Sequence, residues 1–183
     1  MNHKILRLLF ILMLFNSLVG CKKALEFESK TISEDGLENC KAVACPNLDI
    51  DFITVQGDSE QAQKINSILE NYIIQSLYIG ESETGSDATS IEEAMAGFIK
   101  MYRVHSAEFP GLSAEYFAEI TVAPTYNSKD ILSVSASSYL YTGGAHGLGT
   151  TRFFNFDPQT GKQLFYEDVF KDPAIVEKAA EDK

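Results

Sequence analysis

The spacing of apolar residues changes near residue 110, from three or four residues to two. Before this point, residues 62–77 and 91–102 place their apolar side chains along one face of a helix. After it, residues 114–126 and 130–141 alternate like strands and are joined by a turn at 127–129. A further strand is predicted at 49–55, and a hairpin at 151–156 and 163–166. The pattern therefore predicts an α+β domain in which helices cover one face of an antiparallel sheet.

The strand predicted at 130–141 has two chemically different faces. One face is mostly apolar and belongs in the core, since it carries Leu132, Val134, Ala136, Ser138 and Leu140. The other face meets water or a partner, and it carries Ser133, Ser135, Ser137, Tyr139 and Tyr141.

Short motifs predict where several helices begin. Ser90 and Glu93 form a capping box, in which each side chain accepts a backbone N–H at the helix start. Residues 167–170 are typical of a short helical turn, and Pro173 opens another helix. The chain then stops at Lys183 inside that helix. We therefore expect that the C-terminal part of the domain is missing.

The N-terminus has the layout of a secretory signal peptide. Lys4 and Arg7 precede the apolar run 8–15, and Leu18-Val19-Gly20-Cys21 resembles a bacterial lipobox. Residues 1–20 are then cleaved, and Cys21 carries the lipid. The apolar run is shorter than the roughly 20 residues that span a bilayer. The mature protein is expected to be anchored to a membrane of the cell envelope; a plain signal peptide or a short membrane anchor is the alternative.

Residues 21–44 are predicted to be the lipidated cysteine and a tether, with the folded domain at 45–183. The residues after Cys21 are mostly polar and show no sustained period. Lys22, rather than aspartate, follows the cysteine, which favours delivery to the outer membrane. Loss of residues 1–20 leaves 13 basic residues against 26 acidic ones, a formal charge of −13. This charge argues against a nucleic-acid partner and favours a cationic one, although it also keeps a secreted protein soluble.

Cys40 and Cys45 remain as a pair in an oxidising compartment. Four residues separate them, enough for a short loop closed by a disulfide. Two free thiols are the alternative. A metal site is disfavoured because no histidine lies nearby.

One internal motif contains the strongest candidate site residues. Tyr141-Thr142-Gly143-Gly144-Ala145-His146-Gly147 combines glycines, which permit close backbone approach, with a histidine that binds ligands or transfers protons. We take Tyr139, Tyr141, Gly143, Gly144 and His146 as candidate ligand-binding residues. The favoured alternative is a tight connection between strands, held by a hydrogen bond of His146.

No other pattern predicts a catalytic or cofactor site. The chain contains no G-x-S-x-G nucleophile elbow and no phosphate-binding loop, and no cofactor or metal is predicted. Asp157 and Asp168 lie near turns, where calcium binding is one possibility. Turn initiation and helix capping are the favoured roles.

Several spaced motifs are similar to a family of secreted and lipid-anchored bacterial domains of unknown function. They are Ala62, Ile65, Asn66 and Ile68, then the run Ser138–Gly147, and then Asn155-Phe156-Asp157 with Thr160-Gly161-Lys162 and Asp168-Val169-Phe170. The same kind of domain occurs outside the membrane in lysozyme-sensing anti-sigma factors, where it binds lysozyme. It also accompanies the catalytic domain of some peptidoglycan deacetylases.

The resemblance implies a non-enzymatic binding domain. Its expected ligand is a lysozyme-like protein or an envelope glycan, and the acidic charge fits a basic lysozyme. The alternative is an envelope polysaccharide hydrolase or deacetylase that uses His146. The binding hypothesis is preferred because no catalytic constellation is visible.

Overall fold

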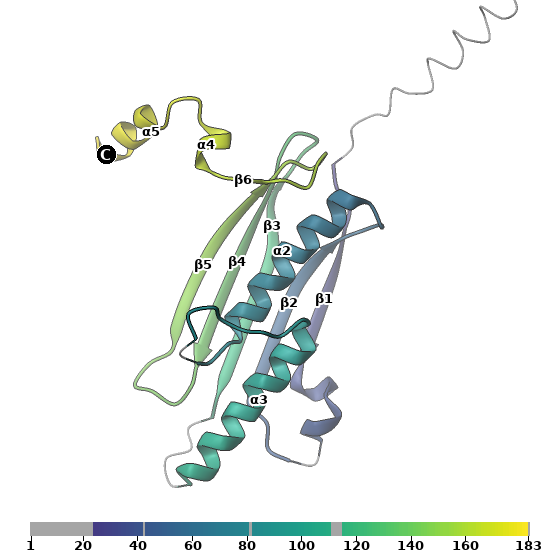
Figure 1. Cartoon of the computed structure of the whole chain (residues 1–183), viewed down its shortest axis with the longest axis vertical. Helices are drawn as coiled ribbons and strands as arrows, with labels where there is room; N and C mark the ends of the chain where they lie inside the picture. The colour runs from purple at the N-terminus through teal and green to yellow at the C-terminus, as the bar shows by residue number, and fades with distance from the viewer. Residues whose placement is uncertain (1–23, 42, 81, 111–114, 183) are drawn as a thin grey trace, which may run out of the picture.

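The computed structural model describes residues 24–41, 43–80, 82–110 and 115–182. Within these ranges the chain forms an open six-stranded sheet, with strands in the order β1 to β6 (Figure 1). The strands are β1 (Phe27–Ser33), β2 (Asn47–Val55), β3 (Phe117–Asn127), β4 (Leu132–Tyr141), β5 (Leu148–Phe156) and β6 (Gln163–Leu164). The helices are α2 (Glu60–Ser76), α3 (Ile91–Glu108), α4 (Tyr166–Val169) and α5 (Pro173–Glu181), with 3-10 turns η2 (Glu34–Gly36) and η3 (Glu38–Cys40). The predicted α+β class is confirmed.

The sheet is antiparallel except where β2 pairs with β3. These two strands run parallel because α2 and α3 connect them as a crossover. The prediction of an antiparallel sheet therefore holds for every neighbouring pair but this one.

The predicted tether contains a strand, so the expectation that folding begins at residue 45 was wrong. β1 pairs along its whole length with β2, from Phe27 opposite Val55 to Ser33 opposite Asp49. β1 lies at the sheet edge, and only its ends are partly buried. A strand that buries so little carries a weak apolar pattern, which is why its sequence resembles a polar linker.

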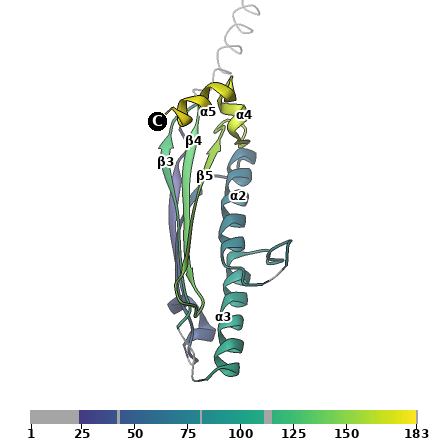
Figure 2. The ribbon, with the colours of Figure 1, turned by 90° about the vertical axis from the view of Figure 1, so that its left-hand side faces the viewer.

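The two long helices pack on one side of the sheet, and Figure 2 shows them end to end along that side. The core between helices and sheet includes Ile65, Leu69 and Ile73 of α2, and Met95 and Phe98 of α3. These residues lie on the predicted helical faces, which confirms the interpretation of the spacing.

Serine side chains cap both long helices. Ser59 Oγ accepts the N–H of Ala62, and Ser90 Oγ accepts the N–H of Glu93 at 3.1 Å. The Glu93 carboxylate accepts the backbone N–H of Thr89 rather than that of Ser90, so the predicted capping box is displaced by one residue. The hydrogen bonds from Thr89 lower the pKa of Glu93.

Asn66 of α2 completes the hydrogen bonding of the sheet where β3 has ended its pairing with β2. The β2–β3 ladder stops at Phe52 and Val122, before the end of β2 at Val55. The Asn66 amide accepts the Val55 N–H at 2.8 Å and donates to the Val55 carbonyl at 3.0 Å. One side chain therefore takes the place of a strand and fixes the first half of α2 to the sheet.

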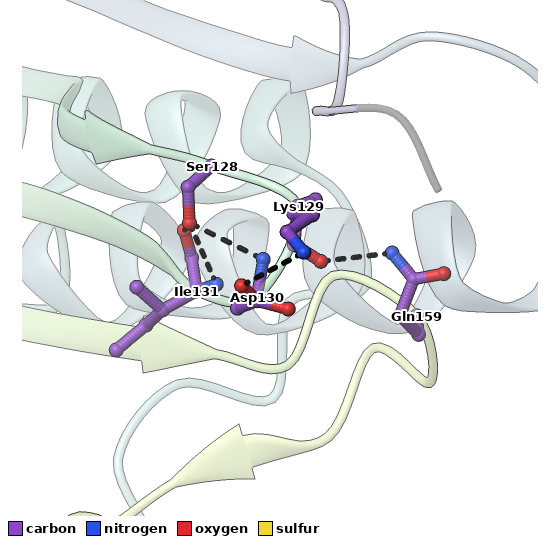
Figure 3. Close-up of polar contacts among 5 residues, drawn as sticks. All are labelled: Ser128, Lys129, Asp130, Ile131 and Gln159. Carbon is purple, nitrogen blue, oxygen red and sulfur yellow. Dashed lines mark hydrogen bonds and ion pairs between the residues drawn. The ribbon is translucent and has the colours of Figure 1, made fainter. Parts of the chain in front are cut away.

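Two turns meet at the end of the sheet that is drawn in Figure 3. In the β3–β4 turn, Ser128 Oγ accepts the N–H groups of Asp130 and Ile131. In the β5–β6 turn, Gln159 donates to the Lys129 carbonyl at 3.1 Å and so joins the two turns. The predicted turn residues thus hold β3 to β6 together at one end.

The C-terminal elements follow the sequence prediction. α4 covers the expected helical turn, and α5 begins at Pro173 with Asp172 accepting the N–H of Ala174. Figure 1 places both elements beyond the end of β6, away from α3.

Candidate functional site

The side chains that point away from α2 and α3 form a polar and aromatic surface, which we call the outer face. Its residues come from four neighbouring strands: Asp49 and Asp51; Phe117, Glu119 and Thr121; Ser137, Tyr139 and Tyr141; Thr151 and Phe153. Buried residues alternate with most of these positions, which confirms the two-faced pattern predicted for 130–141. The outer face contains both tyrosines that the sequence singled out.

One row of the outer face places carboxylates beside Tyr139. Asp49 lies opposite Glu119, Glu119 opposite Tyr139, and Tyr139 opposite Gly149 in the register of the sheet. Neighbouring strands lie about 4.8 Å apart, so these side chains are close neighbours. Asp49 and Glu119 are exposed, and in the described ranges neither has an ion-pair partner. The row is therefore negatively charged and open to a partner.

Tyr139 is held on the surface by packing along its ring. Its ring lies 6.0 Å from the ring of Phe117, centroid to centroid, yet 44% of Tyr139 is exposed. A Cβ on Gly147 would overlap the Tyr139 ring and would lie 2.8 Å from the carbonyl oxygen of Leu140. Gly147 thus lets the hairpin pass close to Tyr139. A shallow hollow of about 260 Å³ beside Tyr139 is also lined by Glu119 and Thr151.

The hairpin between β4 and β5 contains the remaining predicted site residues. Gly143 has a φ of +90°, a conformation that side chains disfavour, while a Cβ on Gly144 would meet no atom nearer than 3.7 Å. His146 is exposed, and Nδ1 lies 3.2 Å from the carbonyl oxygen of Gly147. This is the one hydrogen bond that the His146 ring makes to the described residues. The contact matches the alternative of a histidine that holds its own loop.

The cysteine pair forms a disulfide that joins η3 to the start of β2. The Cα atoms of Cys40 and Cys45 lie 5.4 Å apart. Arg103 of α3 donates to the Asn39 carbonyl at 2.7 Å and lies 3.2 Å from Cys45 Sγ. The disulfide loop is thereby attached to the helix layer. Cys21, the predicted lipidation site, lies outside the described residues.

The two aspartates near turns have structural contacts. Asp157 accepts the N–H of Gln159 and the hydroxyl of Thr160, both at 2.8 Å, as expected for turn initiation. Asp168 pairs with Lys162 and accepts the N–H of Phe165, and these hydrogen bonds lower its pKa. In the part of the chain that the structure describes, no group of three His, Cys, Asp or Glu residues is arranged to hold a metal ion.

A groove on the helix side of the sheet was not predicted from the sequence. It lies between α2 and β5, has a volume of about 710 Å³, and is lined by Asn71 on one wall and by Thr150 and Arg152 on the other. The only sequence signal is polar spacing: Ser67, Asn71 and Gln75 recur every fourth residue on α2, beside its core face.

A family model described as "Deacetylase PdaC" matches residues 40–149, more than half of the chain. The chain belongs to this family. The match includes both long helices, the disulfide, β2 to β4 and the start of β5, whereas β1 precedes it. The predicted resemblance to the accessory domain of peptidoglycan deacetylases is therefore confirmed.

Two solved structures from the DUF3298 family are similar to this PdaC-family chain. The protein from Bacteroides fragilis is 26% identical with a TM-score of 0.64, and the alignment covers 86% of this chain and 66% of that one. The protein from Pseudomonas aeruginosa is 21% identical with a TM-score of 0.58, covering 87% and 65%. The chain thus spans about two thirds of each. No curated protein matched. These matches fit an accessory, non-catalytic domain of unknown function.

Proposed function

We propose that the chain is a lipid-anchored binding protein of the bacterial cell envelope, and that its outer face binds a basic protein of the lysozyme type. The lipid anchor rests on the lipobox-like sequence that ends at Cys21. In the described residues no helix is long and apolar enough to cross a membrane.

The row of Asp49, Glu119 and Tyr139 is the observation that carries the choice of ligand. Two exposed carboxylates, without ion-pair partners among the described residues, attract a cationic surface over long range. Tyr139, fixed against Phe117 and almost half exposed, provides a rigid aromatic contact of the kind that dominates protein interfaces. Charged and aromatic side chains therefore lie together on the outer face. β5 adds the exposed ring of Phe153 to this face.

The family resemblance points to the same ligand. Domains of this kind in lysozyme-sensing anti-sigma factors bind lysozyme, and the chain carries the run Ser138–Gly147 that resembles theirs. Tyr139 and the hairpin glycines belong to this run. The protein's formal charge of −11, or −13 after cleavage before Cys21, also favours a basic partner.

Titration calorimetry of the full chain in a mild non-ionic detergent, with lysozyme as the probe, tests the proposal. The double variant Asp49→Asn/Glu119→Gln should bind at least about tenfold more weakly than the wild type, since rim charges steer and orient a partner. The matched control, Glu92→Gln/Glu108→Gln, removes two exposed charges from α3 and should bind like the wild type. Equal losses of affinity in both variants would mean that binding depends on the net charge of the protein and not on the outer face. A folded wild type that does not bind would refute the proposal.

A further inference from the structure

We propose that the groove between α2 and β5 binds a saccharide that carries a carboxylate. This inference goes beyond the proposed function, because it concerns the opposite side of the sheet and a ligand of opposite charge. It rests on the shape of the groove, on the charge of its lining and on polar groups there that have no partner in the described part of the chain.

The groove exists because α2 covers only part of the last long strand. α2 packs against β2, β3 and β4, and Figure 1 shows β5 beside this helix rather than beneath it. Consequently the helix-side residues Leu148, Thr150 and Arg152 are exposed, and Leu148 keeps 70% of its surface. Farther along β5, Phe154 is buried against Tyr72 of α2. The groove is thus bounded by packed side chains at Phe154 and by exposed ones toward Leu148.

The lining of the groove has the charge of an anion site in an acidic protein. The sequence holds 26 acidic and 15 basic residues, yet none of the described residues that line the groove is acidic. Arg152 provides its positive charge, and in the described ranges its guanidinium has no ion-pair or hydrogen-bond partner. A guanidinium presents two parallel N–H donors that match a carboxylate. The ligand group that best matches Arg152 is therefore a carboxylate.

The other lining groups suit a sugar ring. Ser67 and Asn71 lie four residues apart on α2, are exposed, and have no side-chain hydrogen bond to the described part of the chain. They offer a hydroxyl and an amide to sugar hydroxyls or to an acetamido group. Exposed Leu148 offers an apolar contact for a methyl group.

The rim of the groove is held by contacts within the protein. Gln75 donates to the Ser86 carbonyl at 3.2 Å and accepts the Ser86 N–H at 2.8 Å, which fixes the loop after α2. Ser138 and Thr150 share a hydrogen bond of 2.8 Å across β4 and β5. The walls are therefore formed before a ligand binds, and about 710 Å³ accommodates one or two sugar rings.

Two sugars that differ in one lactyl group, which carries the carboxylate, provide the test: N-acetylmuramic acid and N-acetylglucosamine. Each is titrated into the isotope-labelled full chain in detergent, and amide chemical shifts report both the affinity and the position of binding. We expect N-acetylmuramic acid to move the signals of Asn71 and Thr150 and to bind about tenfold more tightly, the factor typical of one charge-assisted hydrogen bond. Arg152→Gln should abolish this difference.

Lys100→Gln is the matched control, because it removes an exposed positive charge from α3, outside the groove. It should leave the preference for N-acetylmuramic acid unchanged. Equal affinities of the two sugars for the wild type would overturn the inference. So would the absence of binding, shifts confined to the outer face, or an equal effect of both substitutions. Since lysozyme is not used, these results are independent of the proposed function.

Discussion

Replacing Asn66 should cost more stability than its half-buried position suggests. Its side chain is the partner of both polar groups of Val55, at 2.8 and 3.0 Å. The β2–β3 ladder has already ended at Phe52, so after Asn66→Ala no strand takes over these bonds. The change therefore removes two hydrogen bonds and leaves a backbone donor and acceptor without their partner.

The magnitude follows from those two bonds. Each is worth about 1 kcal/mol net, and an unsatisfied group in a partly buried site adds a fraction of its desolvation cost of about 1–3 kcal/mol. We expect Asn66→Ala to lower the free energy of unfolding by about 3 kcal/mol. Alanine favours helix by about 0.5 kcal/mol, which offsets a small part of the loss.

Urea unfolding of the full chain, followed by circular dichroism, measures the effect. Asn71→Ala is the matched control, because Asn71 lies on the same helix, is exposed, and has no side-chain hydrogen bond within the described ranges. Its unfolding free energy should equal that of the wild type or rise slightly. If the two variants differ by less than about 0.5 kcal/mol, the scatter of an exposed substitution, the reasoning on Val55 fails.

Three further outcomes are expected from single features of the fold. Replacing both Cys40 and Cys45 with serine should lower the free energy of unfolding by about 2 kcal/mol, the value for so short a loop. In urea unfolding, a reductant should lower the stability of the wild type to that of the variant and should leave the variant unchanged. Burial raises the pKa of Tyr116 above its ordinary 10.0. The contribution of Tyr116 to the free energy of unfolding is therefore complete below the ordinary pKa and is lost as the pH rises through the folded pKa. The Tyr116→Phe variant should therefore lose less stability between neutral pH and about pH 11 than the wild type, and an identical pH profile would count against this. Gly147→Ala should lower the Tm and weaken lysozyme binding by displacing the tyrosine ring, whereas Gly144→Ala, where a Cβ has room, should change neither.

Much of the fold could be predicted because the long elements carry strong local patterns. The faces of α2 and of β4, the Ser90 cap and the start of α5 at Pro173 all depend on neighbours within a few residues. β1 was missed because an edge strand buries little and lacks a strong pattern. The parallel pairing of β2 with β3 was missed because it depends on where two helices place the returning chain.

The candidate site divides in the same way. Tyr139 and the serines of β4 were predicted from alternation along one strand. The carboxylates beside Tyr139 were not, since Asp49 and Glu119 are brought together only by the register of three strands. The groove was missed because it arises from the position of α2 over the sheet, which leaves Arg152 uncovered. The local spacing of residues does not predict how many strands of the sheet a helix covers.

Calorimetry at low and at moderate salt, which measures the affinity of the full chain for lysozyme, decides whether the outer face binds a basic protein. We expect saturable binding that weakens as salt rises, with a smaller salt dependence in Asp49→Asn/Glu119→Gln, since that variant has lost the charges that salt screens. A folded chain that binds no lysozyme at low salt, or a variant whose salt dependence equals that of the wild type, would contradict this expectation.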